Sequence, residues 1–194
     1  MNRIILASSS PRRAALLKQI SIPFEIITPD VDETPFPFSE DPAGATEQLA
    51  LCKAQTVASQ LNSPNCIVIG ADTVVVLEDR VLGKPDDAAE ARIMLQTLNG
   101  RSHCVITGFA LVETGTDRFI TAHEQTTIYM RCLTDEEIDA YITTGEPLDK
   151  AGAYGAQGYG GSLIERVEGC FYNVVGLPLA KIVTSLKAFG QVGK

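Results

Sequence analysis

The hydrophobic positions of this chain form two patterns: short apolar runs rich in β-branched residues, and longer stretches with an apolar residue at every third or fourth position. The runs predict strands at residues 4–7, 24–27, 66–77, 102–113, 119–132, 163–166 and 172–175. The periodic stretches predict helices at residues 11–18, 43–61, 88–98, 134–141 and 179–189. Helices interspersed with central strands and a hairpin predict an α/β fold, with a mixed twisted sheet and flanking helices.

The strongest strand signal, residues 66–77, carries a carboxylate in its middle. Gly70 and Ala71 precede Asp72 and Thr73 follows it, and we expect this tetrapeptide to interrupt the strand. A buried carboxylate costs free energy unless it is ion-paired, hydrogen-bonded or bound to a metal. Asp72 is therefore the first candidate for chemistry. The alternative is a turn that the same side chain caps through its own backbone.

Composition limits the class of protein. A length of 194 residues favours a single domain, and 45% hydrophobic with 21% charged residues is typical of globular proteins. The net charge of −8 argues against binding to nucleic-acid polymers, which depends on a positive surface. A small polyphosphate needs only a local basic pocket, and an acidic protein can bind it together with a divalent cation.

The cysteines and the N-terminus indicate a cytoplasmic protein. Five cysteines, widely spaced and without a CxxC pair, disfavour both a disulfide framework and a zinc site, and we expect each to be a small buried hydrophobe. The N-terminus lacks the pattern of a signal peptide, and no apolar stretch approaches transmembrane length. We therefore expect no membrane association.

The segment between the first strand and the first helix, residues 8–13 (SSSPRR), is a candidate anion site. A serine ahead of Pro11 can cap the helix, and proline suits the first helical position. The unpaired amides of a helix N-terminus attract anions, and Arg12 and Arg13 add charged donors that match phosphate oxygens. An ordinary capped surface helix is the alternative.

Four further polar residues are candidates with weaker signals. Glu33 lies in a proline-rich loop, and Lys53 lies near the apolar face of the helix at 43–61. Lys84 lies in a rigid Gly-Lys-Pro turn, and glycines surround Gln157, so that a ligand can approach the backbone. Each of them has an ordinary surface residue as its alternative explanation.

Other chemistries find little support. His103 and His123 lie in strand-like stretches without a nucleophile pattern nearby, which disfavours a serine hydrolase. The glycines at 158–161 lack the spacing of a dinucleotide-binding fingerprint and the Lys-Ser/Thr pair of a P-loop.

Five motifs together resemble the Maf family of nucleoside triphosphate pyrophosphatases: residues 6–13 (LASSSPRR), 70–75 (GADTVV), 83–85 (GKP), 149–155 (DKAGAYG) and 173–178 (NVVGLP). The resemblance runs nearly end to end. It implies a single domain over residues 1–194, with an α/β fold similar to inosine triphosphate pyrophosphatases and two lobes around a cleft. It also implies hydrolysis of a nucleotide to its monophosphate and pyrophosphate with a divalent cation, Mg²⁺ or Mn²⁺.

The resemblance also implies roles for individual residues. Asp72 matches the family's catalytic acidic residue. The phosphate-facing loop corresponds to Ser8, Arg12 and Arg13, and further charged residues of the cleft correspond to Glu33, Lys53 and Lys84. We expect Asp72 to act as the general base on water and to hold the metal together with Glu33.

Three positions separate the branches of the family. Arg12, Thr73 and Gln157 match the branch that acts on dTTP and UTP, whereas the 7-methyl-GTP branch has other residues there. The carboxamide of Gln157 suits the O4 and N3–H edge of thymine or uracil. Ala156 stands where a larger aliphatic residue is common, so we expect a slightly larger base pocket, which bears on selectivity and not on activity. The expected substrates are dTTP and UTP, with modified pyrimidine nucleotides as further candidates. Family similarity further suggests a homodimer.

Two other functions stay open at this point. One is a 7-methyl-GTP pyrophosphatase of the same family, and the other is a non-catalytic nucleotide-binding regulator of cell division. Asp72 favours an enzyme, because a negative charge contributes little to phosphate binding without a metal.

Overall fold

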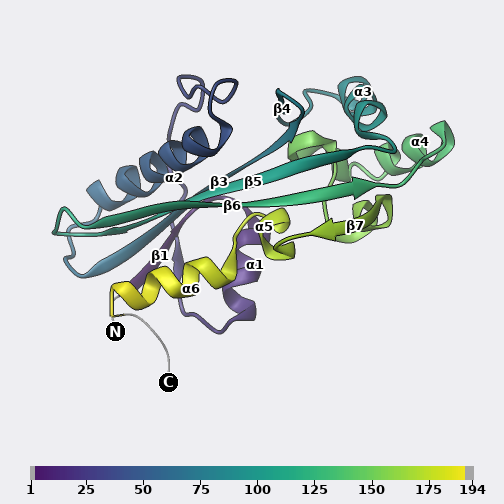
Figure 1. Ribbon diagram of the computed structural model, residues 1–194. Helices are drawn as coiled ribbons and strands as arrows, with labels where there is room; N and C mark the ends of the chain where they lie inside the picture. Colours follow the sequence, from purple (N-terminus) through teal and green to yellow (C-terminus); the bar gives the residue numbers. More distant parts are fainter. Residues whose placement is uncertain (1–2, 191–194) are drawn as a thin grey trace.

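The computed structural model describes residues 3–190 and contains one seven-stranded sheet with helices on both faces (Figure 1). The strands are β1 (Arg3–Ala7), β2 (Glu25–Ile26), β3 (Cys66–Leu77), β4 (Arg80–Leu82), β5 (Ser102–Glu113), β6 (Phe119–Met130) and β7 (Ile164–Glu168). The α-helices are α1 (Pro11–Gln19), α2 (Pro42–Ser59), α3 (Ala88–Leu98), α4 (Asp135–Thr143), α5 (Phe171–Val175) and α6 (Leu179–Ala188). Three 3₁₀ helices follow α4, namely η1 (Glu146–Asp149), η2 (Ala151–Ala153) and η3 (Gly158–Leu163).

The sheet is mixed, as the sequence predicts. Its strand order is β2-β1-β3-β5-β6-β7, with β4 attached to β3. The pairs that β1 makes with β2 and β3 are parallel, and the other pairs are antiparallel. The expected hairpin is formed by β5 and β6. The α/β fold with flanking helices is thus confirmed.

Three clusters of buried apolar residues hold these layers together. One lies between the sheet and helices α1 and α6, and a second lies between the opposite face and α2 (Figure 1). The third lies between one end of the sheet and α3, α4 and the 3₁₀ segments. This end consists of the C-terminal halves of β3 and β6 and the N-terminal half of β5. The first two clusters make one lobe and the third makes the other.

The predicted interruption of the 66–77 strand is wrong. β3 continues through the polar tetrapeptide, and Asp72 pairs with Gly108 of β5 within the ladder. The carboxylate needs no turn because Lys53 of α2 lies 2.8 Å from it and compensates its charge. Asp72 therefore keeps an extended backbone inside the sheet, and the turn-capping alternative is excluded.

Along one edge of β3, four residues lie between two partner strands. β1 pairs with β3 only as far as Gly70, and β4 begins to pair at Val75. Residues 71–74 thus face neither strand on that edge. Side chains alternate along a strand, so Asp72 faces α2, whereas Thr73 faces α1. The fold leaves an opening here that both faces of the sheet can reach.

The strand predicted at 172–175 is also wrong, because this segment forms the short helix α5. Its buried residue Asn173 donates hydrogen bonds from the side chain to the carbonyl of Val105 and to Oγ1 of Thr126, both at 2.9 Å. Gly176, with φ +118°, ends the helix. These tertiary contacts override the β propensity of the segment.

Other predicted boundaries shift by a few residues. The strand expected at 163–166 occupies Ile164–Glu168, the strand expected to reach residue 132 ends at Met130, and the helix expected at 43–61 occupies Pro42–Ser59. Boundaries are the least certain part of a sequence-based assignment.

The prediction that every cysteine is buried is wrong. All five cysteines are free; Cys66 is buried, while Cys132, in the connection after β6, is exposed. Cys52, Cys104 and Cys170 are intermediate. Within residues 3–190, the helices are too short or too polar to cross a bilayer.

Helix α2 approaches the sheet closely at two glycines. A Cβ atom on Gly70 would lie 2.1 Å from the carbonyl oxygen of Ala50, and one on Gly108 would lie 2.3 Å from the backbone carbon of Thr46. The absence of side chains at these positions lets the backbones approach, and this approach brings Lys53 within reach of Asp72.

We expect Gly108→Ala to lower the free energy of unfolding by about 1–3 kcal/mol, because the new methyl group displaces α2. Urea denaturation measures this change. Gly83→Ala is the matched control, since a Cβ there meets no atom within 4 Å. Equal losses of stability in the two variants would contradict the close-approach interpretation.

His103 is a buried histidine in the third cluster's part of the sheet. Its Nε2 atom lies 2.6 Å from the hydroxyl of Tyr154, and its Nδ1 atom has no hydrogen-bond partner in the part of the chain that the structure describes. Burial lowers the pKa of His103 to about 4. The folded protein therefore holds a neutral imidazole.

This burial predicts acid sensitivity. As the pH falls from about 6.5 toward 4, the unfolded chain takes up a proton on His103 and the folded chain does not, so stability is lost. Between pH 7 and pH 5 the loss should be about 2 kcal/mol larger in the wild type than in His103→Gln. Urea denaturation at both pH values measures it. A loss of stability in His103→Gln as large as that of the wild type would refute the assignment.

Candidate active site

A cleft of about 940 Å³ lies beside the open edge of β3. Its walls come from the β1–α1 loop, the proline-rich loop, the turn after β4 and the glycine-rich segment after α4. All nine residues singled out from the sequence line it, namely Ser8, Arg12, Arg13, Glu33, Lys53, Asp72, Thr73, Lys84 and Gln157. Residues as far apart in the sequence as Ser8 and Gln157 thus meet in one cavity.

The β1–α1 loop forms a capped helix start on one wall. Ser10 is the N-cap of α1, and its Oγ accepts a hydrogen bond from the amide of Arg13 at 3.5 Å. Pro11 follows in the first turn, and Oγ of Ser8 accepts from the amide of Ser10 at 3.2 Å. The amide of Arg12 and the positive end of the helix dipole therefore lie at the cleft.

Arg13 is held by three neutral acceptors. Nε donates to the carbonyl of Gly176 at 2.8 Å, and the two terminal nitrogens donate to Thr73 Oγ1 at 3.0 Å and Ser8 Oγ at 3.3 Å. Burial lowers the pKa of Arg13, and the negative charge of Asp72 counteracts this effect. Arginine stays charged in proteins. Since no carboxylate in residues 3–190 pairs with it, its charge favours an anion in the cleft.

Behind Arg13 lies a chain of hydroxyl groups that the sequence did not reveal. Thr107 donates to the backbone carbonyl of Asn173 at 2.9 Å, and its Oγ1 lies 2.9 Å from that of Thr73. Because Thr107 donates its only hydroxyl proton to the carbonyl of Asn173, Thr73 must donate a hydrogen bond to Thr107 and accept one from Arg13. Both Thr107 and Asn173 are fully buried. This chain of hydroxyl groups holds the guanidinium of Arg13 in place.

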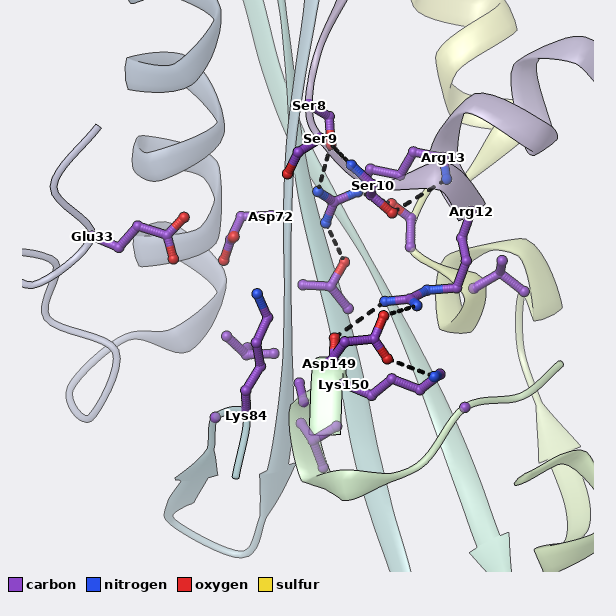
Figure 2. Close-up of a pocket in the computed structure, with 18 of the residues that line it drawn as sticks. Ser8, Ser9, Ser10, Arg12, Arg13, Glu33, Asp72, Lys84, Asp149 and Lys150 are labelled. Atoms are coloured by element: carbon purple, nitrogen blue, oxygen red, sulfur yellow. Dashed lines mark hydrogen bonds and ion pairs between the residues drawn. The ribbon is translucent and has the colours of Figure 1, made fainter. Parts of the chain in front are cut away.

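The carboxylates lie on the other side of β3. Nζ of Lys53 lies 2.8 Å from Oδ1 of Asp72 and 2.7 Å from Oε1 of Glu33 (Figure 2 shows the two carboxylates). Lys53 and Asp72 are only 8% and 9% exposed, whereas Glu33 is exposed. No hydrogen bond from residues 3–190 reaches the second oxygen of Asp72, which is left for water or a cation.

These donors suit a divalent cation that arrives with its substrate. Among the described residues, no group of three or more histidine, cysteine, aspartate or glutamate side chains could enclose a metal. Mg²⁺, however, is usually bound by one or two carboxylates, with phosphate oxygens and water completing its shell. Asp72 and Glu33 converge on one ammonium group and fit that pattern.

Lys84 and Arg12 are two further cationic side chains of the cleft. Lys84 is exposed, and its ammonium group points toward Asp72 and Glu33 (Figure 2). Arg12 is not free, because it lies 2.7 Å from Oδ2 of Asp149, whose Oδ1 binds Lys150 at 2.7 Å. Partial burial would raise the pKa of Asp149, but the hydrogen bonds from Lys150 and Arg12 outweigh it and lower that pKa.

Sequence reasoning missed two more lining residues, Asp149 and Lys150. Both stand in the 149–155 motif, so the signal was present, but the partner of Asp149, Arg12, lies 137 positions away in the sequence. Gln157 is exposed in the cleft at the start of η3, as its flanking glycines allow, and Ala156 beside it is half-buried.

Comparison with known proteins places the chain among its relatives. The family model described as Maf-like protein matches residues 3–189. The chain is 51% identical over 190 residues to the dTTP/UTP pyrophosphatase of Symbiobacterium thermophilum, covering 98% of this chain and 95% of that protein. It is 50% identical to the dTTP/UTP pyrophosphatase of Pelotomaculum thermopropionicum, covering 98% of each.

Comparison with solved structures finds a similar fold in another protein. The Staphylococcus aureus Ham1 protein has a similar structure, with a TM-score of 0.55 and 16% identity over 96% of this chain and 97% of that one. At this identity the likeness concerns the fold alone. Given the family match across residues 3–189 and the identity near 50% over nearly the full length, the chain belongs to the Maf family.

Proposed function

We propose that this protein hydrolyses nucleoside triphosphates, with dTTP and UTP and their modified forms as preferred substrates, to the monophosphate and pyrophosphate. Relatives with about half of their residues identical carry the name dTTP/UTP pyrophosphatase. The observation that carries the proposal is the cleft itself. It brings together the guanidinium of Arg13, which has no carboxylate partner within residues 3–190, and the carboxylates Asp72 and Glu33. The guanidinium would bind a triphosphate, and the carboxylates would activate the attacking water.

The cationic wall would bind the triphosphate. Arg13 presents a fixed charge at the N-terminus of α1, where a phosphate oxygen can also accept a hydrogen bond from the backbone amide of Arg12. Lys84 approaches from the opposite wall. Charge on the departing pyrophosphate is stabilised by the same groups, because they already point into the cleft before the reaction begins.

Asp72 is proposed as the general base. Its second oxygen takes a proton from water while the water oxygen bonds to the α-phosphorus, and the bond from that phosphorus to the bridging oxygen breaks. Lys53 compensates the charge of Asp72 and holds its carboxylate in place through the 2.8 Å contact. Mg²⁺ or Mn²⁺, held by Asp72 and Glu33, would when bound lower the pKa of the water and offset phosphate charge.

The preference for a pyrimidine rests on the three branch positions. Gln157 offers a donor and an acceptor in the cleft, which matches the O4 and N3–H edge of thymine or uracil. Thr73 binds Arg13, and Arg12 binds Asp149, so both also organise charge around the substrate.

We also propose a cytoplasmic homodimer that does not bind nucleic-acid polymers. Family similarity supports the dimer, and the net charge of −8 supports the absence of polymer binding.

Asp72→Asn should lower kcat for dTTP by about 100- to 10,000-fold, the usual contribution of a general base. Pyrophosphate release with Mg²⁺, with Mn²⁺ and with excess EDTA measures it, and circular dichroism checks the fold. Asp79→Asn, in the β3–β4 turn outside the cleft, is the control. Normal turnover of dTTP and UTP by Asp72→Asn would refute the role of Asp72, and full wild-type activity in EDTA would refute the metal.

Lys84→Ala should raise KM for dTTP about tenfold, equivalent to about 1.4 kcal/mol of lost phosphate binding. Because Lys84 is exposed, its removal should change stability by no more than about 0.5 kcal/mol. Steady-state kinetics and thermal melting measure the two effects. Lys187→Ala, at an exposed lysine on α6 away from the cleft, should leave KM unchanged. An unchanged KM in Lys84→Ala would remove Lys84 from phosphate binding.

A further inference from the structure

The loop that carries Gln157 lacks the support of a strand or a long helix. Residues 155–160 run from η2 to the first residues of η3. Their side of the cleft bears the carboxamide proposed to contact the base. What holds this loop therefore determines where Gln157 lies.

The side-chain carboxylate of Glu146 holds this loop. Oε2 of Glu146 accepts a hydrogen bond from the amide of Tyr159 at 3.0 Å, and Oε1 accepts from the amide of Gly160 at 3.1 Å. Both donors follow Gln157 by two or three residues. Hydrogen bonds to a charged acceptor are stronger than those between neutral groups.

Tyr141 of α4 provides the other end of the support. Its hydroxyl accepts from the amide of Gly155 at 3.2 Å and donates to Oε1 of Glu146 at 3.1 Å. Burial, together with the negative charge of Glu146, raises the pKa of Tyr141, so the hydroxyl keeps its proton. The loop is thus bonded to the same pair of side chains on both sides of Gln157.

The glycines of the loop fit closely around this pair. A Cβ on Gly160 would lie 2.4 Å from the carbonyl oxygen of Gly155 and 2.7 Å from the Tyr141 hydroxyl. Gly158 has φ +72°, and a Cβ there would lie 2.7 Å from Oε2 of Glu146. The loop has little room to take another path while Glu146 is in place.

We propose that Glu146 is a positioning residue for base selection, which acts by holding the loop that presents Gln157; this inference rests on the proposed function. Glu146 itself does not line the cleft, and neither does Tyr141. Its influence on the substrate must therefore pass through the loop. Its backbone carbonyl also accepts from Lys150 at 2.6 Å, which links it to the Asp149–Arg12 pair.

Glu146→Gln is the sharpest test because three donors converge on two carboxylate oxygens. A carboxamide has one oxygen and one NH₂ group, so its NH₂ must face at least one of those donors. We expect the ratio of kcat/KM for dTTP to that for GTP to fall about tenfold, mainly through a higher KM for dTTP. Thermal melting checks that the variant is folded.

Two controls separate positioning from general damage. Glu165→Gln makes the same chemical change at an exposed residue of β7 outside the cleft and should keep the wild-type ratio. In a Gln157→Ala background, Glu146→Gln should change the ratio no further, because the group that it positions is gone.

The outcomes are distinct. Equal losses of kcat/KM for dTTP and GTP in Glu146→Gln, or the same fall in the ratio with and without Gln157, overturn this inference alone. A wild-type enzyme with no preference for dTTP over GTP overturns the proposed function, and this inference with it.

Discussion

The architecture of the cleft depends on the buried contact between Lys53 and Asp72. An aspartate in the middle of a central strand is tolerated only if its charge is compensated, and loss of either partner would leave the other charged and largely buried. The compensation is possible because α2 lies unusually close to the sheet over Gly70 and Gly108. Packing and electrostatics are therefore one constraint, since the helix must approach closely for its lysine to reach the strand.

The alternation of side chains along β3 turns this constraint into a site. Asp72 and Thr73 are neighbours in sequence but face opposite sides of the sheet, so the carboxylate joins Lys53 while the hydroxyl joins Arg13. The edge of β3 between β1 and β4 is open at this point. A ligand at that edge can contact the anionic group and the cationic group at once, without any long catalytic loop.

The sequence predicted the layers well because hydrophobic periodicity reflects burial directly. It failed where tertiary contacts decide the local conformation: Lys53 lets β3 continue through Asp72, and the buried bonds of Asn173 make a helix of a strand-like segment. The combined motifs predicted nine residues that line the cleft, yet Thr107 carries no local signal, and the Arg12–Asp149 pair joins residues 137 positions apart. Such pairs follow from topology, which a single sequence does not display.

A strongly acidic protein can bind a polyanion if its few cations are distributed with care. In this cleft Lys53 is committed to two carboxylates and Arg12 to Asp149, so neither adds much net attraction for phosphate. Within residues 3–190 Arg13 has only neutral hydrogen-bond partners, and Lys84 is exposed to the cleft. Affinity would then come from these two groups and the start of α1, while the paired cations compensate the charge of the carboxylates proposed to contact water and metal. The net charge of the protein opposes the binding only of a ligand that is large enough to cover much of its surface. For a small ligand, the ion pairing of the side chains inside the cleft determines the binding.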